Sequence, residues 1–229
     1  MNKDDCAAGI RKSWKLVNEL NLGYTSCCAY LLSVNKEFRK ATLNPESTYV
    51  DVFCTGSRLK HYNFNLDDLS YFQFSLDRGN LRYAYYPNPF SEGVTEEITE
   101  LENDFHYELI SMEEYLQELA EKAPQIGKPV LRYDYSEKQY QELAHPSSHL
   151  HIGFHANNRW PVSKVLTPYA FTSLIVKHYY PDYWSLKEDE NSEYLNELDE
   201  ALVNEKRNKC RVVDDNLFSE KEKNLFHIA

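Results

Sequence analysis

Glycine is scarce in this sequence, while aromatic residues are plentiful. The 229 residues include only seven glycines but 18 tyrosines and 11 phenylalanines. Few glycines indicate few flexible loops, and aromatic side chains pack well on half-buried, pleated surfaces. Hydrophobic residues make up 42% of the chain, which is enough for a sizeable core. The composition therefore excludes a disordered protein and favours a sheet-rich globular one.

Metal-type cysteine spacing and long apolar segments are both missing. The five cysteines are odd in number and form no Cys-x-x-Cys pair, which indicates reduced thiols and not a disulfide framework. No apolar run approaches the roughly 18 residues of a membrane span. The first residues, Met1 to Asp5, show no apolar signal segment. We therefore expect a cytoplasmic protein that does not contact a membrane.

Positive charge is also in deficit. Lys and Arg number 25 against 36 Asp and Glu, giving a formal net charge of −11 and a pI near 5.2. Such a chain repels polyanions at long range, so sequence-independent binding to long duplex DNA or to an anionic membrane is excluded. A local basic cleft remains compatible with this balance.

Hydrophobic periodicity and turn residues predict the order of the elements. Helices are expected at residues 4–22, 27–40, 111–122, 167–180 and 191–209. Strands are expected at residues 49–55, 71–76, 81–86, 104–110, 130–135, 148–155 and 159–163. The pattern predicts an α+β fold with a largely antiparallel sheet and with helices at the N-terminus, mid-chain and C-terminus, packed mainly on one face.

Three local signals are the clearest. Gly79 can adopt the positive φ that a tight hairpin loop requires between residues 71–76 and 81–86. Ser111 and Glu114 have the spacing of a capping box, which starts a helix. Thr167 followed by Pro168 starts another helix, because the threonine caps it and proline tolerates the first turn.

The chain is expected to be a single domain over residues 1–229. Residues 1–45 form its helical beginning, residues 46–165 a sheet-rich core, and residues 167–229 the C-terminal helices. No internal repeat and no low-complexity linker divides these regions.

The most informative segment is the strand at 148–155. Side chains alternate faces along a strand, so His149, His151 and His155 are expected on one face, with Gly153 leaving room beside them. Leu150 and the other apolar residues of the strand would then face the core. A His-x-His pair is close enough for both rings to converge on one metal ion or one phosphate.

The preceding strand offers matching polar groups. Arg132 and Asp134 are expected on one face of residues 130–135, and if the two strands are neighbours they form one wall with the histidines. Imidazoles can act as acid and base, an arginine can bind a phosphate, and a carboxylate can orient an imidazole. We therefore expect His149 and His151 as catalytic acid and base, with Arg132 and Asp134 as the other catalytic residues.

Three further residues are candidates for substrate binding: His145 in the intervening loop, His155, and Tyr133. Two other interpretations stay open. The same wall could bind a metal through two histidines and one carboxylate, as in a metal-dependent hydrolase or oxygenase. The histidines could also be structural or line an interface. Our expectation is that the protein binds no metal and no cofactor.

Several short motifs carry a resemblance to a known family. They are Arg132-Tyr133-Asp134-Tyr135, His145-Pro146-Ser147-Ser148-His149-Leu150-His151-Ile152-Gly153, Pro161-Val162 and Leu166-Thr167-Pro168. With these motifs the sequence resembles a family of bacterial proteins catalogued as a domain of unknown function. The resemblance implies a bacterial origin but transfers no activity. The Arg-Tyr-Asp strand followed by His-x-His is less specifically similar to small bacterial toxin ribonucleases.

The expected function is a metal-independent phosphodiesterase or ribonuclease-like hydrolase, a nuclease effector of a bacterial toxin or antiviral defence system. An RNA or a nucleotide is its expected substrate, and an antitoxin or a defence-complex subunit its expected protein partner. The alternative is a non-catalytic interaction or sensing subunit of a bacterial defence complex.

Overall fold

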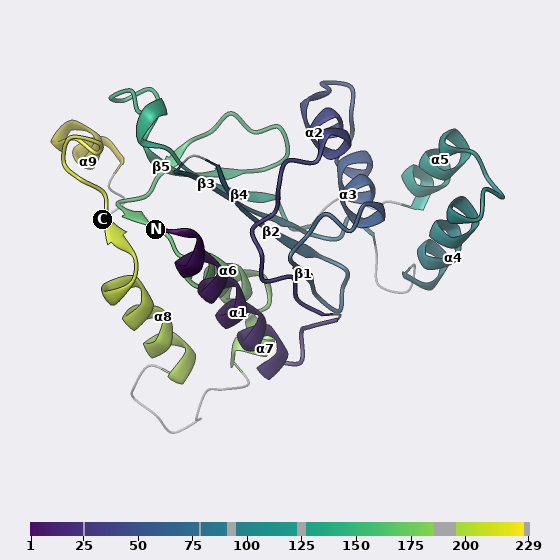
Figure 1. Ribbon diagram of the computed structural model, residues 1–229, viewed down its shortest axis with the longest axis horizontal. Coiled ribbons are helices and arrows are strands. Elements are labelled where there is room, and N and C mark those ends of the chain that lie inside the picture. Colours follow the sequence, from purple (N-terminus) through teal and green to yellow (C-terminus); the bar gives the residue numbers. More distant parts are fainter. Residues whose placement is uncertain (25, 78, 91–94, 123–126, 186–195, 227–229) are drawn as a thin grey trace.

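The protein has an α+β fold in which helices pack against one principal sheet (Figure 1). The computed structural model describes residues 1–24, 26–77, 79–90, 95–122, 127–185 and 196–226. The predicted fold class, with a largely antiparallel sheet and helices at the N-terminus, mid-chain and C-terminus, is confirmed. Among the described helices, none is both long enough and apolar enough to cross a bilayer.

The principal sheet is an antiparallel meander whose described strands are neighbours in chain order. Its strands are β1 (Phe64–Asn65), β2 (Tyr71–Asp77), β3 (Asn80–Tyr86), β4 (Leu131–Tyr135), β5 (Ser148–Ile152) and β6 (Trp160–Pro161). A small second sheet pairs β7 (Lys164–Val165) with β8 (Arg211–Val212).

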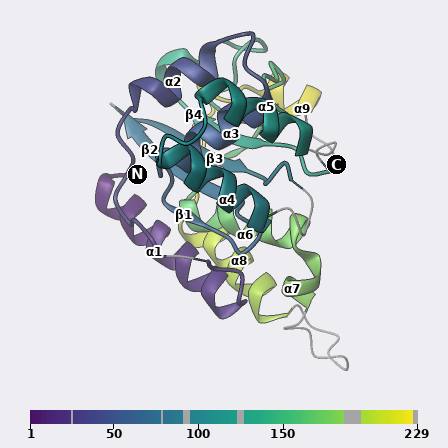
Figure 2. The same ribbon diagram turned by 90° about the vertical axis from the view of Figure 1, so that its right-hand side faces the viewer.

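Helices lie on both sides of this sheet. They are α1 (Lys3–Glu19), α2 (Lys36–Leu43), α3 (Tyr49–Arg58), α4 (Thr95–His106), α5 (Met112–Lys122), α6 (Pro168–Tyr179), α7 (Pro181–Ser185), α8 (Glu197–Asn208) and α9 (Glu220–Phe226). A short 3₁₀ helix covers Glu137–Gln139. Figure 2 shows α1, α6, α7 and α8 on one side of the sheet, and α2, α3 and α5 on the other.

The two faces of β2 show why both sides are covered. Phe72 and Phe74 contact Phe171 of α6 on one face, with ring centroids 6.4 and 6.3 Å apart. Tyr71 stacks on Phe53 of α3 on the other face, at 5.2 Å. The prediction that helices pack mainly on one face is therefore wrong, because β2 and β3 carry large aromatic side chains on both faces and each must be buried.

The predicted hairpin is confirmed. β2 and β3 pair in register from Tyr71 opposite Tyr86 to Asp77 opposite Asn80, and Gly79 has a φ of +89°. Only glycine adopts this left-handed conformation without steric cost. Arg78, which the prediction includes in the loop, lies outside the described residues.

Both predicted helix starts are also confirmed. The Ser111 amide donates to Glu114 Oε2 at 2.9 Å, and the Glu114 amide donates to Ser111 Oγ at 3.2 Å. Thr167 Oγ1 accepts from the amide of Ala170 at 3.1 Å, with Pro168 in the first turn of α6. Each cap satisfies an amide that the helix itself leaves unpaired.

Two predicted strands are wrong, because residues 49–55 are helical and residues 104–110 are the end of a helix followed by a turn. Residues 49–55 form most of α3, where Thr48 and Asp51 make a capping box that favours a helix over the alternating pattern. Residues 104–106 end α4, and Glu108 then turns the chain with a φ of +57°. Phe105 is directed inward and stacks on Tyr115 of α5 at 4.8 Å.

The predicted helix at 27–40 starts too early. Residues before Lys36 run beside β2, where the Leu32 amide donates to the Phe74 carbonyl at 2.9 Å. α2 begins only where the Asn35 side chain accepts from the amide of Phe38. At the other end of the chain, α8 covers most of the predicted helix at 191–209, of which residues 191–195 lie outside the described residues.

Candidate functional site

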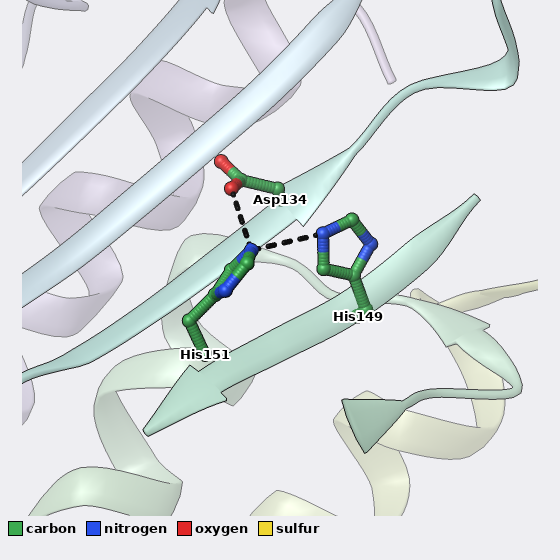
Figure 3. A group of neighbouring side chains, drawn as sticks. All are labelled: Asp134, His149 and His151. Carbon is green, nitrogen blue, oxygen red and sulfur yellow. Dashed lines mark hydrogen bonds and ion pairs between the residues drawn. The ribbon is translucent and has the colours of Figure 1, made fainter. Parts of the chain in front are cut away.

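The site lies on two adjacent strands, as predicted. β4 pairs antiparallel with β5, so Arg132 is directly opposite His151 and Asp134 is opposite His149. All four side chains lie on the sheet face that α2 and α3 cover only in part. Figure 3 shows that the carboxylate of Asp134 and the rings of His149 and His151 point toward one another.

His155 does not share this wall, so the prediction of three histidines on one face is wrong. β5 ends at Ile152, and Gly153 and His155 both have positive φ angles, +106° and +51°. The Asn158 side chain bonds both the amide and the carbonyl of Ile152, at 2.8 Å each, which closes this turn. His155 is exposed and packs against the neighbouring ring of Phe154.

Tyr133 is also separate from the histidine wall. Its side chain is fully buried on the opposite face, toward α6. Its hydroxyl contacts Ser148 Oγ at 2.9 Å and accepts a hydrogen bond from the Leu166 amide at 3.0 Å. The structure therefore places Tyr133 in the core and away from the face that carries the candidate catalytic residues.

The two wall histidines contact each other through one ring nitrogen and the backbone through the other. His149 Nδ1 lies 2.7 Å from the Pro146 carbonyl, and His151 Nδ1 lies 3.1 Å from the Ala156 carbonyl. A carbonyl only accepts, so both Nδ1 atoms carry the hydrogen. If both rings were neutral, neither Nε2 atom would carry a hydrogen. Two such acceptor atoms would repel each other, yet the two Nε2 atoms are 3.1 Å apart, a hydrogen-bond distance. The pair therefore requires a shared proton or a metal ion.

Asp134 is held as an anion beside this pair. Its two carboxylate oxygens each accept from an arginine, Arg82 Nε and Arg132 Nε, at 2.8 Å. His151 Nε2 lies 3.4 Å from the same oxygen that Arg132 binds. Burial on its own would raise the pKa of Asp134, but the His151 hydrogen bond and the two arginine charges hold it well below its usual value.

Burial keeps His149 neutral. Its side chain is only 1% exposed, and this desolvation lowers the pKa of the imidazole to about 4, against a smaller opposing effect of the Pro146 carbonyl and Asp134. His149 is therefore an unprotonated imidazole at neutral pH. His151 supplies the second ring, 5% exposed, in contact with both His149 and Asp134.

The same three side chains could hold a metal ion by geometry. One ligand atom each from Asp134, His149 and His151 lies within 4.8 Å of the others, and the Nδ1–carbonyl contacts resemble those that orient metal-binding histidines. Charge opposes this reading, since Arg82 and Arg132 already outnumber the single carboxylate. A proton adds less positive charge than a divalent ion, and we therefore favour the shared proton.

His145 extends the wall beyond His149. Its ring stands edge-on to that of His149, with centroids 4.9 Å apart. Burial and, to a smaller extent, the nearby guanidinium of Arg159 lower the pKa of His145. The structure therefore brings together five predicted site residues, namely Arg132, Asp134, His145, His149 and His151.

Sequence reasoning missed two arginines of this face, Arg82 and Arg159. Arg82 is opposite Asp134 in the β3–β4 pairing, and Arg159 directly precedes β6. Arg82 could have been noticed only by assuming that β4 pairs with the predicted hairpin. The 44 residues between β3 and β4 leave no local sequence signal of that pairing. Arg159 stands within a predicted strand and carried no other signal.

Comparison with known proteins gives one match. No curated protein and no solved structure matches the chain. A family model described as uncharacterized conserved protein (DUF2290) matches residues 24–229, which includes every residue of the wall. The chain belongs to this DUF2290 family.

Proposed function

We propose that this protein is a metal-independent phosphodiesterase or ribonuclease-like hydrolase that uses His149 and His151 as an acid–base pair. The observation that carries the proposal is the 3.1 Å contact between two Nε2 atoms whose Nδ1 atoms are both committed to carbonyls. One proton shared by two imidazoles provides one base and one acid, which is what phosphoester cleavage requires.

In this mechanism the neutral His149 removes a proton from the attacking hydroxyl group. The new oxygen–phosphorus bond forms as the bond to the leaving oxygen breaks, and His151 donates its proton to that oxygen. Asp134 orients His151 through the 3.4 Å contact between its carboxylate and the imidazole Nε2 atom. The Nε2–Nε2 contact must separate when substrate binds, since each ring has to reach a different oxygen.

Arg132 and Arg82 supply the positive charge for the phosphate. Their side chains are 39% and 67% exposed, so each can reach a ligand while its Nε atom stays on Asp134. A guanidinium binds phosphate oxygens in bidentate fashion and stabilises the charge that develops on them. In this proposal the buried histidine pair transfers protons, and the exposed arginines bind the phosphate.

The proposal is tested by cleavage of labelled single-stranded RNA and of 2′,3′-cyclic nucleotides in the presence of EDTA. His151→Asn is the main variant, because its amide can still donate to the Ala156 carbonyl while the acid is lost. We expect a loss of about 10²- to 10⁴-fold in rate with little change in melting temperature. Arg132→Lys should also lower the rate, because lysine keeps the charge but loses the planar fork.

His178→Asn, an exposed histidine on α6, is the matched control and should keep full activity. Full activity of His151→Asn would contradict the acid–base assignment. A wild-type protein that cleaves none of these substrates would contradict the phosphodiesterase proposal as a whole.

One observation favours a second candidate, a non-catalytic interaction or sensing subunit of a bacterial defence complex. His149 and His151 are nearly buried, and each ring has polar partners on both nitrogens. Such a satisfied network also serves to specify a rigid core. Under this candidate, His151→Asn would alter stability and partner binding, and no substrate would be cleaved.

A further inference from the structure

Two buried nitrogen atoms at the edge of the wall have no partner. Within the described residues, Arg159 Nε and His145 Nδ1 are both shielded from solvent and make no hydrogen bond. Buried polar atoms normally have partners, so each unpaired one calls for a specific explanation. Arg159 as a whole is only half-buried, and its Nη1 atom donates to the Asn157 carbonyl at 3.4 Å. A guanidinium has five N–H donors, so Arg159 keeps donors for an acceptor-rich group at the surface.

Arg159 directly precedes β6, which pairs with β5 on the side away from β4, so the histidines lie between it and the arginines of Asp134. His145 is in contact with His149, at 4.9 Å between ring centroids, and the guanidinium of Arg159 is close enough to affect the charge of His145. Arg82 lies on β3 and Arg159 borders β6, which is three strands away in the sheet. Adjacent strands are about 4.8 Å apart, so these backbones are separated by about 14 Å.

This separation defines two cationic positions with the acid–base pair between them. The first is formed by Arg82 and Arg132, and the second by Arg159, with the His145 ring beside it as a hydrogen-bonding group. The carboxylate of Asp134 belongs to the first position, where each of its oxygens accepts a hydrogen bond from one of the two arginines. One phosphate group is too small to occupy both positions, so a substrate that uses both must carry at least two.

We infer that Arg159 and His145 form a second phosphate subsite, and that the substrate is a single-stranded nucleic-acid segment with a phosphate on each side of a nucleoside. This inference rests on the proposed function, because the first phosphate is the one that is cleaved. The local cluster of three arginines accounts for anion binding by a chain whose net charge is −11.

The subsite is tested by isothermal titration calorimetry with two thymidine dinucleotides, dTpdT with one phosphate and pdTpdT with two. Both lack the 2′-hydroxyl that a ribonuclease uses. We expect wild-type protein to bind pdTpdT about tenfold more tightly than dTpdT, because one additional charge-assisted hydrogen bond changes an affinity by about this factor. Arg159→Gln should remove this preference and leave the affinity for dTpdT unchanged.

Arg207→Gln is the matched control, because Arg207 is an exposed arginine at the end of α8. It should keep the preference. The affinity of Arg159→Gln for pdTpdT should also depend less on salt concentration than that of the wild type, because one screened charge contact is lost. His145→Gln should weaken the preference too, and it replaces Arg159→Gln if that variant does not fold.

The outcomes separate the subsite from the catalytic proposal. Equal effects of Arg159→Gln and Arg207→Gln, or no binding of either dinucleotide by the wild type, would overturn the subsite. A preference that depends on Arg159, found in a protein that cleaves no RNA, would preserve the subsite and reject the catalytic role of the histidine pair.

Discussion

Burial gives His149 its chemical character. An imidazole that is withdrawn from water resists protonation, so the pKa of His149 falls to about 4. The unfolded chain still binds a proton at this residue below about pH 6.5. Between these two values the unfolded state therefore holds more protons than the folded state, and the folded state loses stability as the pH falls.

We accordingly predict that His149 makes the protein less stable in acid. The free energy of unfolding should fall by about 3 kcal/mol from this residue as the pH drops from 6.5 to 4, and should change little from it above pH 6.5. His149→Asn keeps a donor for the Pro146 carbonyl but cannot titrate, so it should flatten this part of the curve. Urea unfolding at several pH values measures the effect.

His178→Asn serves as the control, because this histidine is exposed on α6. Its curve should follow that of the wild type. If the wild type and His149→Asn show the same pH dependence between pH 4 and 6.5, the buried imidazole is not the source of the acid sensitivity.

At the scale of elements, the approach of α1 to α6 is unusually close. A Cβ atom at Gly9 of α1 would lie 2.8 Å from the Pro168 Cδ atom, which is closer than such atoms pack. Pro168 is held in the first turn of α6 by the Thr167 cap, so its ring cannot easily withdraw. The Gly9–Pro168 contact therefore sets how closely α1 packs against α6.

We predict that Gly9→Val destabilises the protein by about 1–3 kcal/mol or more through overpacking. Ala8→Val is the control, because Ala8 is exposed on the same helix. Valine is a poorer helix former than alanine but a better one than glycine, so propensity alone would make Ala8→Val the more destabilising of the two. Chemical denaturation of the two variants gives the comparison. Equal stability of both variants would mean that α1 can shift away from α6 without cost.

At the scale of the whole molecule, charge is distributed unevenly. The chain is acidic overall, yet Arg82 and Arg132 both bind the single carboxylate of Asp134 beside the histidine pair. This arrangement attracts anions locally and opposes the addition of a divalent cation next to the histidine pair. The geometry of the site is thus compatible with a metal ion, whereas its positive charge favours a shared proton, and we give the charge more weight.

We therefore predict that purified protein contains no stoichiometric zinc, iron or manganese, as measured by elemental analysis. Added zinc should raise the melting temperature of the Arg82→Gln, Arg132→Gln double variant more than that of the wild type, since the competing charges are then removed. About one transition-metal ion per wild-type chain would overturn this prediction, and the metal-dependent interpretation of the same three ligands would replace it.

The sequence by itself determined the features that depend on neighbouring residues. The β2–β3 hairpin follows from Gly79, and the starts of α5 and α6 follow from Ser111 and Thr167, because turns and caps are made within a few residues. Alternation along β4 and β5 likewise predicted which side chains share a face, as far as Ile152. The α+β class and the core of the candidate site were therefore predictable.

Only the tertiary structure decided the rest, because it depends on contacts between residues far apart in the chain. Pairing of β3 with β4 brings Arg82 to Asp134 across 52 positions, and the turn after Ile152 removes His155 from the wall while Arg159 comes near His145. The segment 49–55 alternates like a strand, yet its cap and its packing on Tyr71 make it a helix. Burial then sets the protonation of His149, which no local pattern specifies.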